Sequence, residues 1–342
     1  MTKLEFGLMS LGDLLPHPTS GEIATEAQRH RSLVDQAVQA ERIGFTSVHL
    51  GEHHFSDYML SSPPVVLAAI GERTSDLKLS TSVTLAGNLD PVRVAEDYAT
   101  VDVLSGGRVE IVAGRGSLFV KTYDGFGQPV ETARERYDES VALLARLLRE
   151  EAVHWSGEFR TPLTGHTTRP RPVGDMPIWI GAASRESATL AADIGGWLML
   201  PTVFGTPEMF RPVVEIYRER WAELGKPEAE AKIGACSHTY VADNKTGRHN
   251  TVNDWVKYYE AYWNFVGTMV PSEFWPPFDF EKLQVGPAIC GSPEAVIDRI
   301  GQWQEILSMD RHLFMFDLGG MPAEEVTETI ELFGTSVVPA FG

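Results

Sequence analysis

The chain has 342 residues, of which 43% are hydrophobic, and this fraction is ample for the core of one large domain or two ordinary ones. Its formal net charge of −18 argues against nucleic acid and anionic membranes as partners, because their phosphates would repel it. The sequence shows no cleavable leader and no apolar run long enough to span a bilayer, so we expect a cytoplasmic protein.

Short apolar segments alternate with helical patterns along almost the whole chain. Eight of them have the composition of β-strands, and they cover residues 4–9, 47–50, 77–83, 109–113, 177–181, 197–200, 233–241 and 312–317. Helices are expected between them, for example over residues 22–43, where Gly44 provides a C-terminal stop. Eight strands separated by helices predict an α/β fold whose parallel sheet closes into a (β/α)8 TIM barrel. No GxGxxG motif follows the first strand, which argues against an open dinucleotide-binding sheet.

One long connection, residues 244–290, interrupts this alternation between the seventh and eighth strands. It is crowded with aromatic side chains, namely Trp255, Tyr258, Tyr259, Tyr262, Trp263, Phe265, Phe274, Trp275, Phe278 and Phe280. Long connections inside a compact domain are often lids, binding segments or interfaces. We therefore expect a mobile cover over an apolar pocket or a subunit contact, within a single domain that spans residues 1–342.

Two polar motifs directly follow predicted strands, where a barrel places its chemistry. Glu52, His53 and His54 follow the second strand, and Arg115, flanked by glycines, follows the fourth. A histidine can transfer protons near neutral pH, and an arginine can bind a phosphate through two hydrogen bonds. Adjacent residues rarely converge on one metal ion, and the two cysteines lack CxxC spacing, so we expect no metal site.

In their order and spacing, several motifs resemble the bacterial luciferase-like flavin-dependent monooxygenases along nearly the full chain. The motifs are Glu52-His53-His54-Phe55, Asp90-Pro91-Val92-Arg93, Leu104-Ser105-Gly106-Gly107-Arg108, Ala113-Gly114-Arg115-Gly116, Pro177-Ile178-Trp179-Ile180-Gly181-Ala182-Ala183-Ser184 and Gly319-Gly320-Met321-Pro322. The resemblance implies a single (β/α)8 barrel, commonly dimeric, that holds reduced FMN at its C-terminal mouth. It also implies that the insertion after the seventh strand is a mobile lid.

The resemblance further implies a set of cofactor-binding residues. They are Glu52, Ser82, Val83, Arg115, Gly116, Ser184 and Ser187. Ser184 and Ser187 flank the start of a helix, whose free N–H groups and dipole favour a phosphate, and by the family pattern they bind it with Arg115. Each serine could equally be a plain helix N-cap. Ser82 and Val83 match the place where the family carries a cis, non-proline peptide bond beside the flavin ring.

His53 matches the catalytic histidine of the family, since a reduced flavin that reacts with oxygen must exchange protons. We expect His54 to be structural. Glu52 could orient a ring, contact the phosphate side of the site or act as a buried counter-ion. His238, on the seventh strand, is a further pocket candidate, but an isolated histidine on a strand is more often a satisfied core residue.

The reaction implied is that of a two-component FMN-dependent monooxygenase. A separate flavin reductase supplies reduced FMN, oxygen adds at C4a, and the peroxyflavin oxidises a small apolar organic substrate; the protein is expected to be a homodimer. Gly114 stands where light-emitting luciferases carry a reactive cysteine, so light emission is not expected. Two alternatives are a deazaflavin-dependent hydride-transfer oxidoreductase, disfavoured by the few basic residues at strand exits, and a non-catalytic flavin-binding partner subunit, disfavoured by His53.

Overall fold

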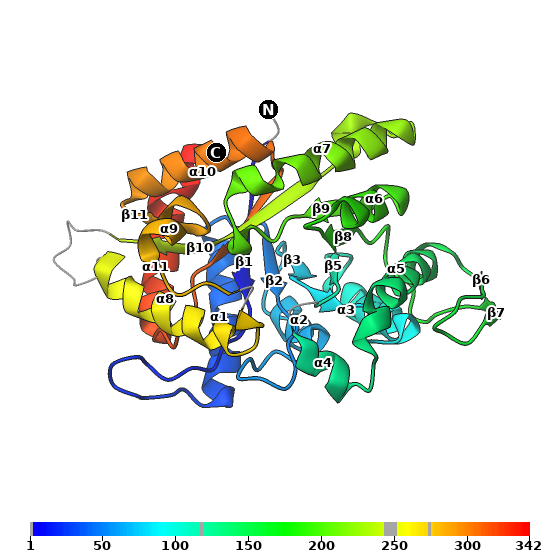
Figure 1. The fold of residues 1–342 in the computed structure, drawn as a ribbon, viewed down its shortest axis with the longest axis horizontal. Helices are drawn as coiled ribbons and strands as arrows, with labels where there is room; N and C mark the ends of the chain where they lie inside the picture. Colours follow the sequence, from blue (N-terminus) through cyan, green and yellow to red (C-terminus); the bar gives the residue numbers. More distant parts are fainter. Residues whose placement is uncertain (1–2, 117–118, 243–251, 273–274) are drawn as a thin grey trace.

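A parallel barrel forms the centre of the computed structural model, which describes residues 3–116, 119–242, 252–272 and 275–342 (Figure 1). Its wall consists of β1 (Glu5–Ser10), β2 (Ser47–Leu50), β3 (Lys78–Thr81), β4 (Thr84–Leu85), β5 (Ile111–Gly114), β8 (Ile178–Gly181), β9 (Trp197–Met199), β10 (Ile233–Val241) and β12 (Arg311–Met315). The order around the wall is β3-β2-β1-β12-β10-β9-β8-β5-β4, and all neighbours in it are parallel. This arrangement confirms the predicted barrel.

One end of this strand order, β3, lies within the predicted strand 77–83, and the other end, β4, begins at the residue that follows it. Between them the peptide bond from Ser82 to Val83 is cis, as the resemblance implied. Leu79 in β3 forms a parallel bridge with Val109 just before β5, and β4 pairs with β5 itself. The wall is therefore nearly closed, and the first and last predicted strands, β1 and β12, lie side by side within it.

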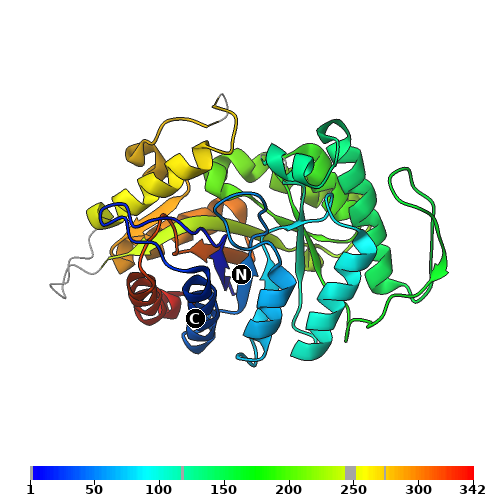
Figure 2. The same ribbon diagram turned by 90° about the horizontal axis from the view of Figure 1, so that it is seen from below.

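Helices surround the barrel and follow most of its strands (Figures 1 and 2). They are α1 (Glu26–Arg42), α2 (Pro63–Gly71), α3 (Pro91–Ser105), α4 (Val120–Gly125), α5 (Ala133–Arg149), α6 (Arg185–Asp193), α7 (Pro207–Glu223), α10 (Pro293–Leu307) and α11 (Ala323–Ser336), with 3₁₀ helices at Val130–Thr132, Thr202–Phe204, Glu228–Glu230 and Val338–Phe341. Within the described residues, no helix combines the length and apolar character that a membrane span needs.

Local capping decides where the helices begin and end. Thr25 and Gln28 form a capping box, so α1 begins at residue 26 and not at residue 22 as predicted. The Asp90 carboxylate accepts hydrogen bonds from the first turn of α3, and Gly106, with a φ of 73°, ends that helix in the left-handed conformation that glycine tolerates best. These caps fix the residues at which α1 and α3 begin and at which α3 ends.

Two separate apolar clusters form the core. The first lies between the wall and the outer helices, where Phe6 of β1 and Phe314 of β12 pack against Phe333 of α11. The second lies inside the barrel and continues beyond its mouth, and it includes Met9 and Met315. This division follows from strand geometry, since alternate residues of each strand point outward to the helices and inward to the barrel.

A buried ion-pair network fills the opposite end of the barrel, where the strands begin. The Arg311 guanidinium, 1% exposed, pairs with Glu110 at 2.5 Å and with Glu5 at 2.5 Å. The indole N–H of Trp179 donates to Glu110 at 2.9 Å, and the same ring lies 4.9 Å from the Arg311 guanidinium. These contacts close the bottom of the barrel, so the inner cluster opens only towards the strands' C-terminal ends.

The chain also contains elements that the sequence pattern did not predict. An antiparallel hairpin, β6 (Val153–Trp155) with β7 (Leu163–His166), projects from the barrel beside α5 (Figure 1). The predicted insertion 244–290 contains α8 (Val252–Gly267), α9 (Phe280–Val285) and most of β11 (Ala288–Gly291), which pairs parallel with β10. Residues 243–251 and 273–274, and with them Phe274, lie outside the described residues.

Candidate active site

The predicted site residues follow four neighbouring strands of the wall. Glu52 and His53 come after β2, Ser82 and Val83 join β3 to β4, Arg115 and Gly116 come after β5, and Ser184 and Ser187 come after β8. Because parallel strands end at the same edge, these exits form one arc of the barrel mouth. The structure therefore brings together elements that are 135 positions apart in the sequence, between residues 52 and 187.

Glu52 links two of these exits and is itself buried. One carboxylate oxygen accepts a hydrogen bond from the His54 ring at 2.8 Å, and the other accepts from the Leu85 amide at 3.0 Å. The Glu52 amide donates to the Val83 carbonyl at 3.1 Å. Glu52 thus orients the His54 ring and joins the β2 exit to the β3–β4 segment, which agrees with the structural role expected for His54.

His53 points into the apolar part of the mouth. Its ring stacks on Tyr58, with centroids 4.0 Å apart, and meets the edge of Phe119 at 5.0 Å. Burial lowers the pKa of His53 to about 3, so the ring is neutral near neutral pH, although a free histidine titrates there. Its Nδ1 atom is buried and has no hydrogen-bond partner among the described residues. His53 can therefore offer one ring nitrogen to a ligand.

Arg115 is a half-buried cation whose side chain is not committed elsewhere. Its carbonyl accepts a hydrogen bond from the Tyr123 hydroxyl, but its guanidinium has no hydrogen bond or ion pair within the part of the chain that the structure describes. Gly116 has a φ of 67°, and an added Cβ there would lie 2.6 Å from the Leu85 side chain. The glycine thus permits the turn that presents Arg115; Ser117 lies outside the described residues.

Ser184 and Ser187 form a capping box at the N-terminus of α6. The Ser184 amide donates to the Ser187 hydroxyl at 3.2 Å, and the two hydroxyl oxygens are 3.0 Å apart. A hydrogen bond from Ser184 lowers the pKa of the neighbouring Glu186. The N-cap function considered from the sequence is therefore present, and the same hydroxyls lie where the helix dipole favours an anion.

The aromatic insertion covers the mouth through α8, which lies at this end of the barrel in Figure 2. Its buried residues Trp255, Tyr259 and Tyr262 belong to the same apolar cluster as the inward-facing residues of the strands. The Tyr58 hydroxyl, from the loop after β2, donates to the Tyr262 hydroxyl at 3.2 Å. The predicted cover is thus packed against the mouth, and its motion stays a prediction.

His238 differs from the expectation of a satisfied core residue. Its Nδ1 atom lies 2.8 Å from the Tyr259 hydroxyl, but its Nε2 atom is buried without a hydrogen-bond partner in the described part of the chain. Burial lowers its pKa to about 3, so this ring is also neutral. The sequence places His238 on the correct strand, but it does not show that α8 supplies Tyr259, the hydrogen-bond partner of Nδ1.

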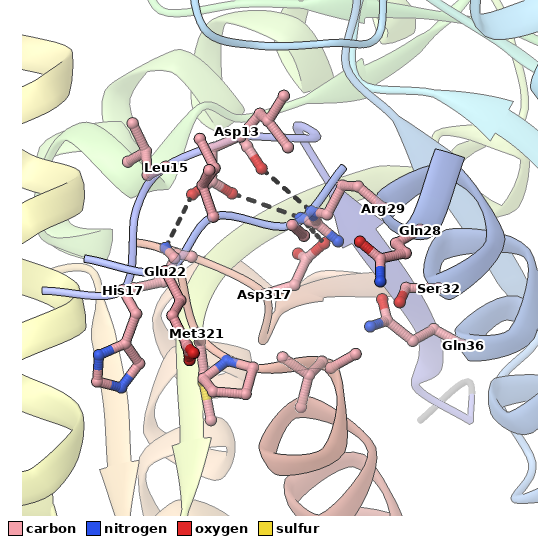
Figure 3. Close-up of a pocket in the computed structure, with 18 of the residues that line it drawn as sticks. Asp13, Leu15, His17, Glu22, Gln28, Arg29, Ser32, Gln36, Asp317 and Met321 are labelled. Atoms are coloured by element: carbon pink, nitrogen blue, oxygen red, sulfur yellow. Dashed lines mark hydrogen bonds and ion pairs between the residues drawn. The ribbon is translucent and has the colours of Figure 1, made fainter. Parts of the chain in front are cut away.

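A groove of about 670 Å³ lies beside this site, between α1, α11 and the loops after β1 and β12 (Figure 3). Arg29 pairs there with Asp317 at 2.6 Å and with Asp13 at 3.5 Å, and burial raises the pKa of Asp13 to about 6. Asp317 also accepts a hydrogen bond from Ser10 at 2.6 Å. None of the predicted site residues lines this groove. The ion-paired residues Asp13, Arg29 and Asp317 come from both ends of the chain, so no local sequence pattern could predict their contact.

Known proteins resemble the chain over most of its length. The sequence profile of the family described as luciferase-like monooxygenase matches residues 4–308. The chain is 24% identical over 347 residues to the oxygenase component of the flavin-dependent trigonelline monooxygenase of Acinetobacter baylyi, covering 94% of this chain and 93% of that protein. It is 31% identical over 188 residues to an F420-dependent glucose-6-phosphate dehydrogenase of Segniliparus rotundus, and this match covers 53% of this chain and 56% of that protein.

Solved structures share the fold. The monooxygenase RslO1 from Streptomyces bottropensis has a TM-score of 0.88 at 24% identity, covering 99% of this chain and 100% of that chain. The FMN complex of the oxygenating constituent of 3,6-diketocamphane monooxygenase from Pseudomonas putida has a TM-score of 0.76 at 16% identity, covering 99% of this chain and 99% of that chain. At these identities the likeness establishes the fold alone.

Proposed function

The chain belongs to the luciferase-like monooxygenase family, and from that premise we propose that it is the oxygenase component of a two-component, FMN-dependent monooxygenase. A separate flavin reductase supplies reduced FMN, and the substrate is a small apolar organic molecule. The observation that carries this proposal is the arc of the mouth where an uncommitted arginine, a helix N-terminus and a neutral histidine follow neighbouring strands.

The charge and hydrogen-bonding groups at these strand exits support FMN as the cofactor. Arg115, Ser184 and Ser187 would hold the phosphate, because a free guanidinium and a helix N-terminus both favour an anion. The flavin ring would lie by the Ser82–Val83 peptide. A bound reduced flavin would supply the electrons that activate oxygen.

The protein's own residues would control protons and water around the reaction. His53, neutral and with Nδ1 free, can accept or donate a hydrogen bond at the flavin face of the mouth. Glu52 keeps the β2 exit in place through its bonds to His54 and Leu85. The aromatic residues of α8 would exclude water, which limits the wasteful release of hydrogen peroxide.

A deazaflavin-dependent oxidoreductase is the second candidate, and the F420-dependent relative favours it. The cofactor F420 carries a longer and more anionic tail than FMN. Glu186 lies in the first turn of α6, and the chain has a net charge of −18, so the surroundings of the phosphate position disfavour additional negative charge. These charges support FMN over F420.

The proposal is tested by mixing the protein anaerobically with photoreduced FMN and then with oxygenated buffer. We expect the flavin to reoxidise more slowly than free reduced FMN, because the covered mouth protects it. Arg115→Ala should remove the delay by weakening FMN binding, whereas Arg211→Ala, which breaks an exposed ion pair with Glu215 on α7, should not. Reoxidation of the wild-type mixture at the rate of free FMN would reject the proposal.

A further inference from the structure

His238 faces the predicted flavin site from the opposite side of the barrel. Counting β3 and β4 as one position, the wall has eight positions, and β10 lies four positions from β3–β4 in either direction. The side of the mouth that carries His238 is therefore opposite Ser82 and Val83. A substrate between the flavin and α8 would lie against this side.

The surroundings of His238 are aromatic. The ring meets Tyr259 at a centroid distance of 5.1 Å and Tyr262 at 5.4 Å, with interplanar angles of 69° and 73°. It is 3% exposed, and Nδ1 is bound to the Tyr259 hydroxyl while Nε2 has no partner among the described residues. A buried polar atom without a partner costs free energy, so Nε2 is a point where a ligand gains by supplying one.

His238 is also connected to His53. Tyr262, which borders His238, is hydrogen-bonded to Tyr58, and Tyr58 stacks on His53. Two neutral histidines, each with one ring nitrogen that has no hydrogen-bond partner in the described part of the chain, thus border the Tyr58–Tyr262 pair. Around His238 the neighbouring side chains of the inner cluster are aromatic or aliphatic, and the polar atoms next to the ring are tyrosine hydroxyls, a combination that suits a planar molecule with few polar groups.

An unpaired ring nitrogen alone does not identify a binding residue, as His312 illustrates. Its Nε2 lies 3.0 Å from the Ser237 hydroxyl and its Nδ1 is unpaired, but the ring is stacked against Trp303 and Phe314. His312 lies on the outer face of β12, within the cluster between wall and helices. The position of His238 at the mouth, and not its unpaired nitrogen by itself, distinguishes the two.

We propose that His238 is a specificity-determining residue, whose Nε2 binds the hydroxyl of an aromatic substrate that packs against Tyr259 and Tyr262. This inference rests on the proposed function and names its substrate class. The Tyr259 hydroxyl can either donate to Nδ1 or accept from it, so Nε2 can be a donor or an acceptor. A phenolic hydroxyl matches either state, because it can both accept and donate.

The inference is tested with two probes that differ by one hydroxyl, 2-naphthol and naphthalene. Their dissociation constants are measured by equilibrium dialysis against the full chain in the presence of FMN. We expect the wild type to bind 2-naphthol about tenfold more tightly, as a satisfied buried polar group predicts. His238→Leu should reduce this ratio to about two or less by weakening 2-naphthol binding, while His238→Gln should retain part of it. The matched control His312→Leu should leave the ratio unchanged.

Three results would overturn the inference. The first is that the wild type binds the two probes equally, or binds neither. The second is that His238→Leu leaves the ratio of the two dissociation constants unchanged, and the third is that this variant loses FMN affinity while the ratio stays the same. If His238→Leu does not fold, the ratio of the two dissociation constants in the wild type and in His238→Gln still tests the inference. Titration of the same samples with reduced FMN separates the two hypotheses. If the wild type shows no probe preference but still binds FMN, only the inference is rejected, whereas absent FMN binding by the wild type rejects the proposed function.

Discussion

At the scale of single residues, Gly114 shows how closely the site is packed. A Cβ added at this position would lie 2.2 Å from one methyl carbon of Val83 and 2.7 Å from its Cβ. The reactive cysteine of light-emitting luciferases therefore has no room here. We predict that Gly114→Cys lowers the free energy of unfolding by about 1–3 kcal/mol, the usual cost of overpacking. The double variant Val83→Ala with Gly114→Cys should recover part of this loss in urea unfolding, because it removes the methyl carbon at 2.2 Å but keeps the Cβ at 2.7 Å. A single variant as stable as the wild type would contradict the steric account.

His53 is predicted to act on the reaction and not on cofactor affinity. His53→Asn should keep the dissociation constant for reduced FMN within about twofold, because the phosphate contacts remain, and should slow turnover by about 10²–10⁴-fold, the usual contribution of a proton-transferring group. The measurement pairs anaerobic FMN titration with oxygen consumption in the presence of a flavin reductase. A variant that binds FMN and keeps full turnover would remove His53 from the catalytic role.

The residues of the site could be predicted from the sequence only where a local motif carries them. Glu52, His53 and Arg115 follow strands directly, so their position at the mouth follows from the fold. The Tyr58–Tyr262 hydrogen bond and the bond between His238 and Tyr259 could not be predicted, because each depends on a tyrosine of α8 that the sequence does not place. The ordinary pKa of histidine was a poor guide for His53, since burial keeps its ring neutral.

At the scale of elements, the Tyr58–Tyr262 hydrogen bond ties α8 to the loop after β2. Tyr58→Phe and Tyr262→Phe should each lower the free energy of unfolding by about 1 kcal/mol, and the double variant should cost little more than either alone, because both remove the same bond. The control is Tyr217→Phe, whose hydroxyl donates to the Gly196 carbonyl between α7 and β9. In urea unfolding, the losses in free energy of unfolding from Tyr217→Phe and Tyr58→Phe should add in the double variant. If the losses from Tyr58→Phe and Tyr262→Phe also add, the two hydroxyls do not stabilise the fold through a shared hydrogen bond.

The order of elements could be predicted almost fully, because buried strands and their following helices have strong patterns. All eight predicted strands are present, although the strand predicted over residues 77–83 ends at Thr81 and a further short strand, β4, follows at Thr84–Leu85. The β6–β7 hairpin was missed, since it is short and mostly exposed, and β11 was missed because it begins inside the aromatic insertion. Helix ends followed their caps, as the start of α1 at Glu26, directly after its N-cap Thr25, illustrates.

At the scale of the whole molecule, four buried histidines make stability depend on pH. Burial lowers the pKa values of His49, His53, His238 and His312 to about 3, whereas an unfolded histidine titrates near 6.5. The unfolded chain therefore binds more protons below pH 6.5, and stability present above that value is lost as the pH falls towards 3. Asp13 contributes to the pH dependence of stability with the opposite sign. Its pKa is raised to about 6 in the fold, so as the pH falls the folded state binds this proton before the unfolded state does.

We predict that lowering the pH from 7.5 to 5.5 reduces the free energy of unfolding by about 1.4 kcal/mol for each of these histidines, offset by about 1 kcal/mol from Asp13. Urea unfolding at the two pH values measures the change. His312→Gln should reduce the difference by about the share of one histidine. A free energy of unfolding that does not change over this interval would show that the histidines are not held neutral in the fold.

The central claim is that this barrel binds reduced FMN at the mouth formed by β2, β3–β4, β5 and β8. The most direct measurement is an anaerobic titration of the purified protein with reduced FMN and, separately, with reduced F420. The account predicts saturable binding of reduced FMN that is tighter than that of F420 and is weakened at least tenfold by Arg115→Ala, the loss of about 1.4 kcal/mol. Tight binding of F420 without binding of FMN would contradict it and establish the deazaflavin alternative.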